Sequence, residues 1–274
     1  MDRNKPLRLI GLSSIKPEKN PKLTLSRLYQ LPGLCPIEKC IATVSKEDML
    51  QHLAQYHFQS NVKKHMQVAF NGERCTLVFD VSQLIGAQTI CLGVLLYGGA
   101  RGKNNELPGE RQFCYRNILK PGSELESMTA HLPIMVLVKR ITFLSWAFVD
   151  RNTESDVDLG GQIVHSGQEI NDQEKTVKAE QEEILDSDLL IIWTQSAPCI
   201  RPLHVAMTAF NRTLTVGRSA MLSVANSGRM YTELRGKDLP KDRHALLLTE
   251  ADLKEICGAE HHLHLELILN EASE

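Results

Sequence analysis

The segment from Cys35 to His57 constrains the fold of this chain more than any other stretch. It places two cysteines and two histidines in the spacing C-x4-C-x11-H-x4-H, on Cys35, Cys40, His52 and His57. Two thiolates from a turn and two imidazoles from a following helix are the usual ligands of a closed tetrahedral zinc site. Four protein ligands leave no position for water or substrate, so the predicted Zn²⁺ is structural. A unit of this size cannot bury enough apolar surface to fold alone. We therefore expect the metal to supply its folding free energy, on the order of 10 kcal/mol.

The residues between the ligands predict how this segment folds. Ser45 is expected to cap a helix, with Asp48 in the place of the usual glutamate of a capping box. Val44 and Met49 stand where a hydrophobic staple would fix the entry of the chain. The two histidines are five residues apart, not the four that stack side chains on one helix face, which predicts a distorted last turn at His57. The simpler alternative is that the segment contains two buried cysteines and two ordinary surface histidines. The occurrence of all four residues in this order, with a helix start between the cysteines and the histidines, favours a zinc site.

Charge and composition select no special environment. Thirty-three acidic against thirty-one basic residues give a formal charge of -2, which points to neither nucleic acid nor membrane. No apolar run is long enough to span a bilayer, and the N-terminus lacks the apolar region of a signal peptide. Seven cysteines without a secretory signal indicate a reducing compartment. We therefore expect an intracellular protein, in the cytoplasm or the nucleus.

The chain divides into an arm, a finger and a β-rich body. Residues 1–30 form a predicted basic flexible arm, and residues 31–62 the predicted zinc finger. From residue 66 to 270, alternation and short apolar runs replace helical spacing, which predicts a β-sandwich with one short helix near Ala251–Cys257. Strands are expected at Arg74–Val81, Thr89–Tyr97, Arg111–Ile118, Pro133–Arg140, Phe143–Asp150, Leu189–Gln195, His204–Phe210, Ala220–Ala225, Arg229–Leu234 and His262–Leu269.

A long acidic insertion interrupts the strands at residues 151–188. It carries eleven Asp and Glu against three Lys and Arg. Such a segment is most simply a disordered surface loop. An acidic docking segment for a basic partner is the alternative reading.

No catalytic constellation stands out. Gly98 to Lys103 invites comparison with a phosphate-binding loop, but Asn104 stands where Ser or Thr must hold magnesium. His261, His262 and His264 cluster near the C-terminus without carboxylates that would give them an acid–base role. We therefore expect that the protein is not an enzyme.

The order of finger and all-β region resembles the substrate-binding half of the seven-in-absentia family of ubiquitin ligases. RMYTELRGKDLP and HALLLTEADLKEICGAEHHLHLELIL are similar to the family's last strands with their short helix. The resemblance implies that Cys35, Cys40, His52 and His57 bind zinc, that a TRAF-like sandwich follows, and that the chain self-associates. Residues 1–34 contain no cysteine or histidine, so no RING precedes the finger and ligase activity is not implied. The chain also resembles an insect protein family of the same layout, which brings no known activity.

The predicted fold is therefore mainly β: a small Cys2His2-type zinc finger, then an antiparallel TRAF-like β-sandwich with a long acidic insertion. The predicted function is a zinc-binding adaptor that recognises a protein partner, with a link to ubiquitin ligase assemblies implied by the resemblance. Such sandwiches take an extended peptide in a groove or along a sheet edge. The alternative is nucleic-acid binding through the finger, whose base-reading positions would be Ser45, Asp48 and Gln51. The negative charge of Asp48 would oppose the phosphates, which disfavours this alternative.

Overall fold

A computed structural model of the chain describes most of the predicted finger and body. The described residues are 32–37, 39–58, 62–84, 88–99, 116–148, 188–198, 202–229, 234–235, 239–258 and 260–271. The predicted basic arm, residues 151–187 of the acidic insertion, and most of the strands predicted at 111–118 and 229–234 lie outside them. Within the described ranges, none of the helices combines the length and the apolar character needed to cross a membrane.

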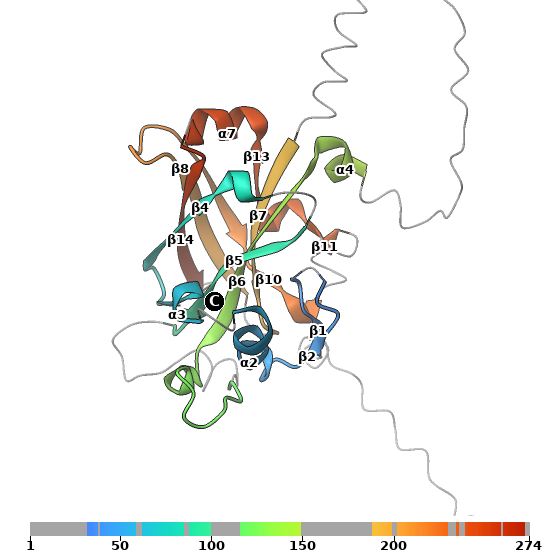
Figure 1. Ribbon diagram of the computed structural model, residues 1–274, viewed down its shortest axis with the longest axis vertical. Coiled ribbons are helices and arrows are strands. Elements are labelled where there is room, and N and C mark those ends of the chain that lie inside the picture. The colour runs from blue at the N-terminus through green and yellow to red at the C-terminus, as the bar shows by residue number, and fades with distance from the viewer. Residues whose placement is uncertain are drawn as a thin grey trace, which may run out of the picture.

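The described chain is mainly β, as predicted (Figure 1). Its strands are β1 (Gly33–Leu34), β2 (Thr43–Val44), β3 (Met66–Ala69), β4 (Arg74–Asp80), β5 (Ile90–Tyr97), β6 (Leu132–Thr142), β7 (Asp188–Ser196), β8 (Leu203–Phe210), β9 (Gly217–Ser223), β10 (Ala225–Asn226), β11 (Leu234–Arg235), β12 (Leu239–Pro240), β13 (Ala245–Thr249) and β14 (His262–Glu271). Its helices are α2 (Met49–His52), the π-helix η1 (Leu53–His57), α3 (Val62–His65), α4 (Phe143–Phe148), α7 (Glu250–Cys257) and the 3-10 turns η2 (Val81–Gln83), η3 (Glu126–Met128), η5 (Ser227–Arg229) and η6 (Asp242–His244).

Two sheets form the body of the molecule. The six-stranded sheet has the order β10-β7-β6-β5-β3, with β13 also paired to β7. The four-stranded sheet has the order β4-β14-β8-β9, and all of its pairs are antiparallel. The prediction of an antiparallel body is wrong at two pairs of the larger sheet, where β3 runs parallel to β5 and β10 parallel to β7. Both parallel strands are short and lie at or near a sheet edge, where pairing depends on tertiary position more than on side-chain periodicity.

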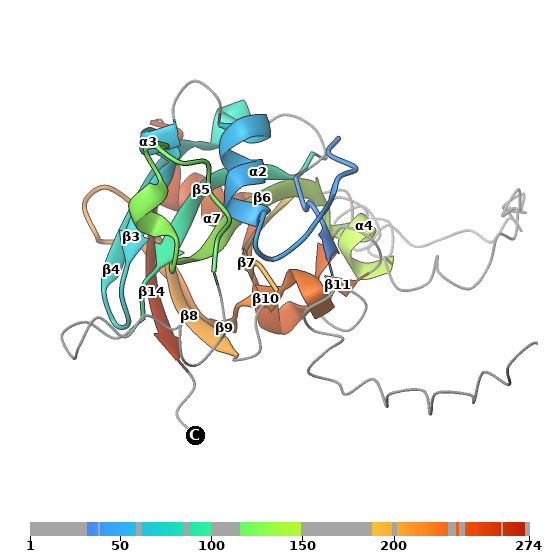
Figure 2. The ribbon, with the colours of Figure 1, turned by 90° about the horizontal axis from the view of Figure 1, so that it is seen from below.

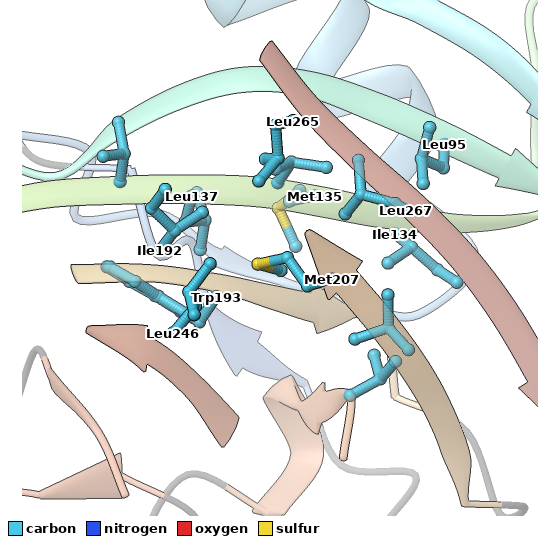
Figure 3. Packing of buried hydrophobic residues seen from close by; sticks show 14 of the residues in the cluster. Leu95, Ile134, Met135, Leu137, Ile192, Trp193, Met207, Leu246, Leu265 and Leu267 are labelled. Atoms are coloured by element: carbon cyan, nitrogen blue, oxygen red, sulfur yellow. The ribbon is translucent and has the colours of Figure 1, made fainter. Parts of the chain in front are cut away.

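The four-stranded sheet shows the period-2 pattern that its sequence predicts. Leu263, Leu265, Leu267 and Leu269 of β14 are buried, while the residues between them are half-buried. Alternate side chains of a strand point to opposite faces, so one face of this sheet packs on the core and the other is more open. Figure 3 shows Leu265 and Leu267 in the apolar cluster that also contains Leu95 of the six-stranded sheet.

The six-stranded sheet is buried on both faces. Seven consecutive residues of β6 from Leu132, and eight of β7 from Leu189, are buried. Continuous apolar runs are typical of strands that are covered on both sides. The four-stranded sheet covers one side, and α2 lies over β5 and β6 on the other (Figure 2). The segment predicted as a finger is therefore a third layer of the fold.

Two sequence predictions about single elements have different outcomes. The prediction of a strand at Phe143–Asp150 is wrong, because the helix α4 begins at Phe143. The Thr142 hydroxyl accepts a hydrogen bond from the Ser145 backbone N–H (3.2 Å), as at a helix N-terminus. The helix predicted at Ala251–Cys257 is confirmed as α7, which a capping box between Thr249 and Asp252 initiates.

Candidate metal centre

A short hairpin positions the two cysteines. β1 and β2 pair antiparallel, and the Cys35 N–H donates to the Ala42 carbonyl (2.9 Å) just beyond them. The chain then turns tightly, with the Cys40 N–H bonded to the Ile37 carbonyl (3.1 Å) and Lys39 in the left-handed region at φ 67°. This turn brings the sulfurs of two residues five apart toward one point.

A change of helix type positions the two histidines. α2 ends at His52, and η1 continues it as a π-helix to His57. In a π-helix the hydrogen bond spans five residues, as the Phe58 N–H to Leu53 carbonyl bond does here (3.1 Å). The wider turn brings residues five apart onto nearly the same side of the helix. The distortion predicted at the last turn from the H-x4-H spacing is therefore confirmed.

The start of this helix differs slightly from the prediction. The Ser45 hydroxyl accepts the Asp48 N–H (3.2 Å) and donates to the Asp48 carboxylate (2.7 Å), so the predicted local pair forms. The predicted helix start is wrong, however, because the regular α2 helix begins at Met49 with Asp48 as its N-cap, three residues later than a Ser45 cap would place it. Ser45 and Asp48 thus organise the turn that leads into the helix. Val44 and Met49, the predicted staple, are both buried.

The structure brings all four predicted ligands together. One ligand atom from each of Cys35, Cys40, His52 and His57 lies within 4.8 Å of the others. Cys35 Sγ is 3.4 Å from His57 Nε2, Cys40 Sγ is 3.5 Å from His52 Nε2, and the two Nε2 atoms are 3.2 Å apart. Segments separated by up to 22 residues thus converge on one small volume.

These separations match the edges of a zinc tetrahedron. Bond lengths of about 2.0 Å to nitrogen and 2.3 Å to sulfur give edges of roughly 3.3 Å between nitrogens and 3.5 Å between nitrogen and sulfur. Without a cation, each thiol can donate to one imidazole, but the two Nε2 atoms then face each other at 3.2 Å with both lone pairs already used as acceptors. The donor set and the geometry therefore fit a four-coordinate divalent metal with no open position.

Burial changes the pKa values of the two histidines and of Cys35. It lowers the pKa of His52, and it lowers the pKa of His57 together with the charge of His52, so both imidazoles favour the neutral form that binds metal. Burial also raises the pKa of Cys35 to about 12, and nearby Cys40 contributes in the same direction. A buried thiol of this kind ionises only when a cation displaces its proton.

Contacts from distant segments hold the site in place, and the sequence did not reveal them. The Ile118 N–H donates to the Glu47 carbonyl (2.8 Å), and the Lys120 N–H donates to the side-chain oxygen of Gln51 (3.1 Å). A Cβ added at Gly33 would lie only 2.8 Å from the Ser227 carbonyl oxygen. None of these residues belongs to a motif, so sequence spacing gives no signal for them.

The histidines near the C-terminus do not belong to the candidate metal site. Across the part of the chain that the structure describes, the Cys35 group is the single set of three or more residues with metal-ligand spacing. His262 Nδ1 contacts the Glu260 carbonyl (2.6 Å), and the His264 ring stacks on Phe210. His262 and His264 thus have local partners.

Comparison with models of protein families identifies the family of this chain. A model described as "Domain of unknown function (DUF4729)" matches residues 34–259. The chain belongs to this family. The matched DUF4729 segment contains all four metal-site residues and both sheets except β14, which lies between β4 and β8. A search of the curated proteins found no match. The resemblance to the seven-in-absentia family gains no support here and stays a prediction.

Proposed function

We propose that this DUF4729 protein is an intracellular adaptor, in which a structural Zn²⁺ holds the finger and the TRAF-like β-sandwich binds an extended peptide of a partner protein. The convergence of Cys35, Cys40, His52 and His57 supports the zinc. The free Cys75, Cys91 and Cys257 support a reducing compartment. No catalytic role is part of the proposal. A link to ubiquitin ligase assemblies and self-association rest on the resemblance alone.

The observation that carries the peptide-binding proposal is the edge position of β4. In the described part of the chain, β4 pairs only with β14, so its other side is a sheet edge. The Val81 N–H bonds to the His261 carbonyl, and hydrogen-bonded pairs alternate along an antiparallel ladder. The N–H and C=O groups of Arg74, Thr76 and Val78 therefore point to the edge, where an added strand would pair with them. The side chains of these three residues are exposed.

The opposite edge of the same sheet is less suited to a peptide. Arg218 of β9 donates to Asp252 (2.7 Å) and Glu255 (2.9 Å) of α7. The His244 ring of η6 contacts the Ser223 carbonyl at the end of β9 (2.6 Å). α7 and η6 therefore flank β9, which favours β4 as the binding edge.

A peptide-display selection against the zinc-loaded chain, followed by affinity measurement, tests this proposal. Val78→Pro removes an edge N–H that β14 does not use, and proline is tolerated on edge strands. We expect it to weaken binding of the selected peptides at least about tenfold, because strand addition depends on main-chain pairing. Met221→Lys is the matched control, because Met221 is also exposed (68%) but lies on β9. Unchanged binding by Val78→Pro, with zinc content and circular dichroism intact, would contradict the proposal.

Nucleic-acid binding is the weaker alternative. Ser45 and Asp48 hydrogen bond to each other, and Gln51 accepts the Lys120 N–H. All three positions that would read bases are therefore engaged within the protein. A salt-dependent shift in fluorescence anisotropy with duplex DNA would revive this alternative.

A further inference from the structure

The finger, defined as residues 33–58, closes one face of the six-stranded sheet. Met49, Leu50 and Leu53 of its helix are fully buried and belong to the same apolar core as the sheets. Figure 2 places α2 over β5 and β6. The finger is thus a cover of the sheet.

The register of β5 and β6 identifies the face beneath the finger. Cys91 pairs with Leu137, and Val94 pairs with Met135, so these four side chains share a face. α2 lies over β5 and β6 on the side away from the four-stranded sheet (Figure 2), which places the finger on this face. We call the set Cys91, Val94, Leu96, Met135 and Leu137 the covered face; apart from half-buried Cys91, its residues are buried.

The other face of the same strands belongs to the sandwich. The Tyr97 hydroxyl donates to Glu271 of β14 (3.1 Å), and a Cβ at Gly93 would contact Leu77 of β4. The side chains that lie between the two sheets are therefore a different set from those of the covered face, although both sets belong to one continuous apolar cluster. The set between the sheets contains Leu95, Leu265 and Leu267, which are fully buried (Figure 3).

The finger contains only short elements of secondary structure. Its strands have two residues each, α2 has four and η1 has five. Elements this short are not stable by themselves. Its four ligand atoms lie within 4.8 Å of one another, an arrangement that a cation would stabilise.

We propose that the metal is a latch: its loss releases the finger and opens the covered face, while the two-sheet sandwich stays folded. The proposal rests on the zinc site of the proposed function. Release would expose a contiguous apolar surface on β5 and β6, and exposed apolar patches of this kind drive association with other chains. Metal content would thereby control which surface the protein presents.

Hydrogen exchange with mass spectrometry on the full zinc-loaded chain, before and after removal of zinc by a strong chelator, tests the latch. We expect exchange at least about tenfold faster in residues 33–58, with β8 and β14 still protected. Thiol alkylation in the same samples should newly label Cys35 and Cys40, while Cys75 and Cys257, buried in the sandwich, stay unlabelled. Added zinc should restore protection, and Cys40→Ser should reproduce the chelated pattern.

Two outcomes overturn the latch. Loss of protection in β8 and β14, or labelling of Cys75, on zinc removal would mean that finger and sandwich unfold as one unit. A finger that stays protected after verified zinc removal would mean that packing alone holds it. A chain that purifies without metal and with a protected finger would instead refute the zinc site itself, and the latch with it.

Discussion

At the scale of single residues, the candidate metal site offers a closed set of ligands. Each of Cys35, Cys40, His52 and His57 offers one ligand atom, and within the described residues the group with metal-ligand spacing consists of these four. Because the finger elements are short, the loss of one ligand removes both metal affinity and local folding free energy. The effect of a ligand substitution should therefore exceed that of an ordinary core substitution.

Cys40→Ser should reduce bound zinc from one per chain to a small fraction. We expect the affinity to fall by more than the ~100-fold that loss of an outer-shell partner can cost, since a direct ligand is lost. Elemental analysis by mass spectrometry of the purified protein measures the effect. Cys257→Ala is the matched control, because Cys257 is a buried thiol of α7 outside the site. Full zinc content in Cys40→Ser would show that Cys40 is not a ligand.

His244 should make stability depend on pH. Burial lowers the pKa of His244, with smaller opposing and reinforcing contributions from the Ser223 carbonyl and the charges of Arg243 and Lys241. The unfolded state, with a histidine pKa of about 6.5, then binds the proton more readily than the folded state. The stabilisation is therefore full above about pH 6.5 and is lost as the pH falls toward the lowered pKa of the folded state. Denaturant unfolding between about pH 5 and 8 should show a shallower acid loss in His244→Gln than in the wild type. Equal slopes would assign the acid sensitivity to other groups.

At the scale of elements, local hydrogen bonds decide where helices begin and how they turn. The π-helix η1 is needed because H-x4-H spacing does not align on a regular α-helix. α7 begins where Thr249 and Asp252 exchange bonds between side chain and backbone. Both features are local: the spacing of the histidines predicted a distorted turn at His57, and a short helix was expected near Ala251–Cys257.

Thr249→Ala should lower the free energy of unfolding by about 1 kcal/mol, because the Asp252 N–H loses its cap. Thr249→Ser keeps the hydroxyl and should retain most of the stability. Chemical denaturation of the two variants and the wild type measures the difference. Equal destabilisation by alanine and serine would assign the effect to the lost methyl group and contradict the capping role.

At the scale of the whole molecule, a hydrogen-bond network around the buried Tyr97 joins the two sheets. The Tyr97 hydroxyl of β5 lies 3.1 Å from Asn71 Oδ1 and from Glu271 Oε1, while Asn71 Oδ1 also accepts the Glu271 N–H (2.8 Å). The turn after β3 and the end of β14 thus meet at the end of β5. This contact joins residues up to 200 positions apart.

Tyr97→Phe should lower the free energy of unfolding by about 1 kcal/mol, the usual net value of a lost hydrogen bond. Tyr56→Phe is the control, because Tyr56 is 68% exposed and should change stability little. Thermal or denaturant unfolding of both variants gives the comparison. A Tyr97→Phe protein as stable as the wild type would show that the hydrogen bond between Asn71 and Glu271 is sufficient and that the Tyr97 hydroxyl adds no stability.

The sequence by itself determined the features that local physics encodes. The four metal-site residues follow from spacing, the alternating strand β14 from its period of two, and α7 from the short segment between the last strands. Only the tertiary structure decided that the finger covers the six-stranded sheet, that β3 and β10 pair in parallel, and that β4 is left at an open edge. These outcomes depend on which apolar faces meet across long stretches of chain. Periodicity tells which side of a strand is buried, but it carries no information on the segment that buries it.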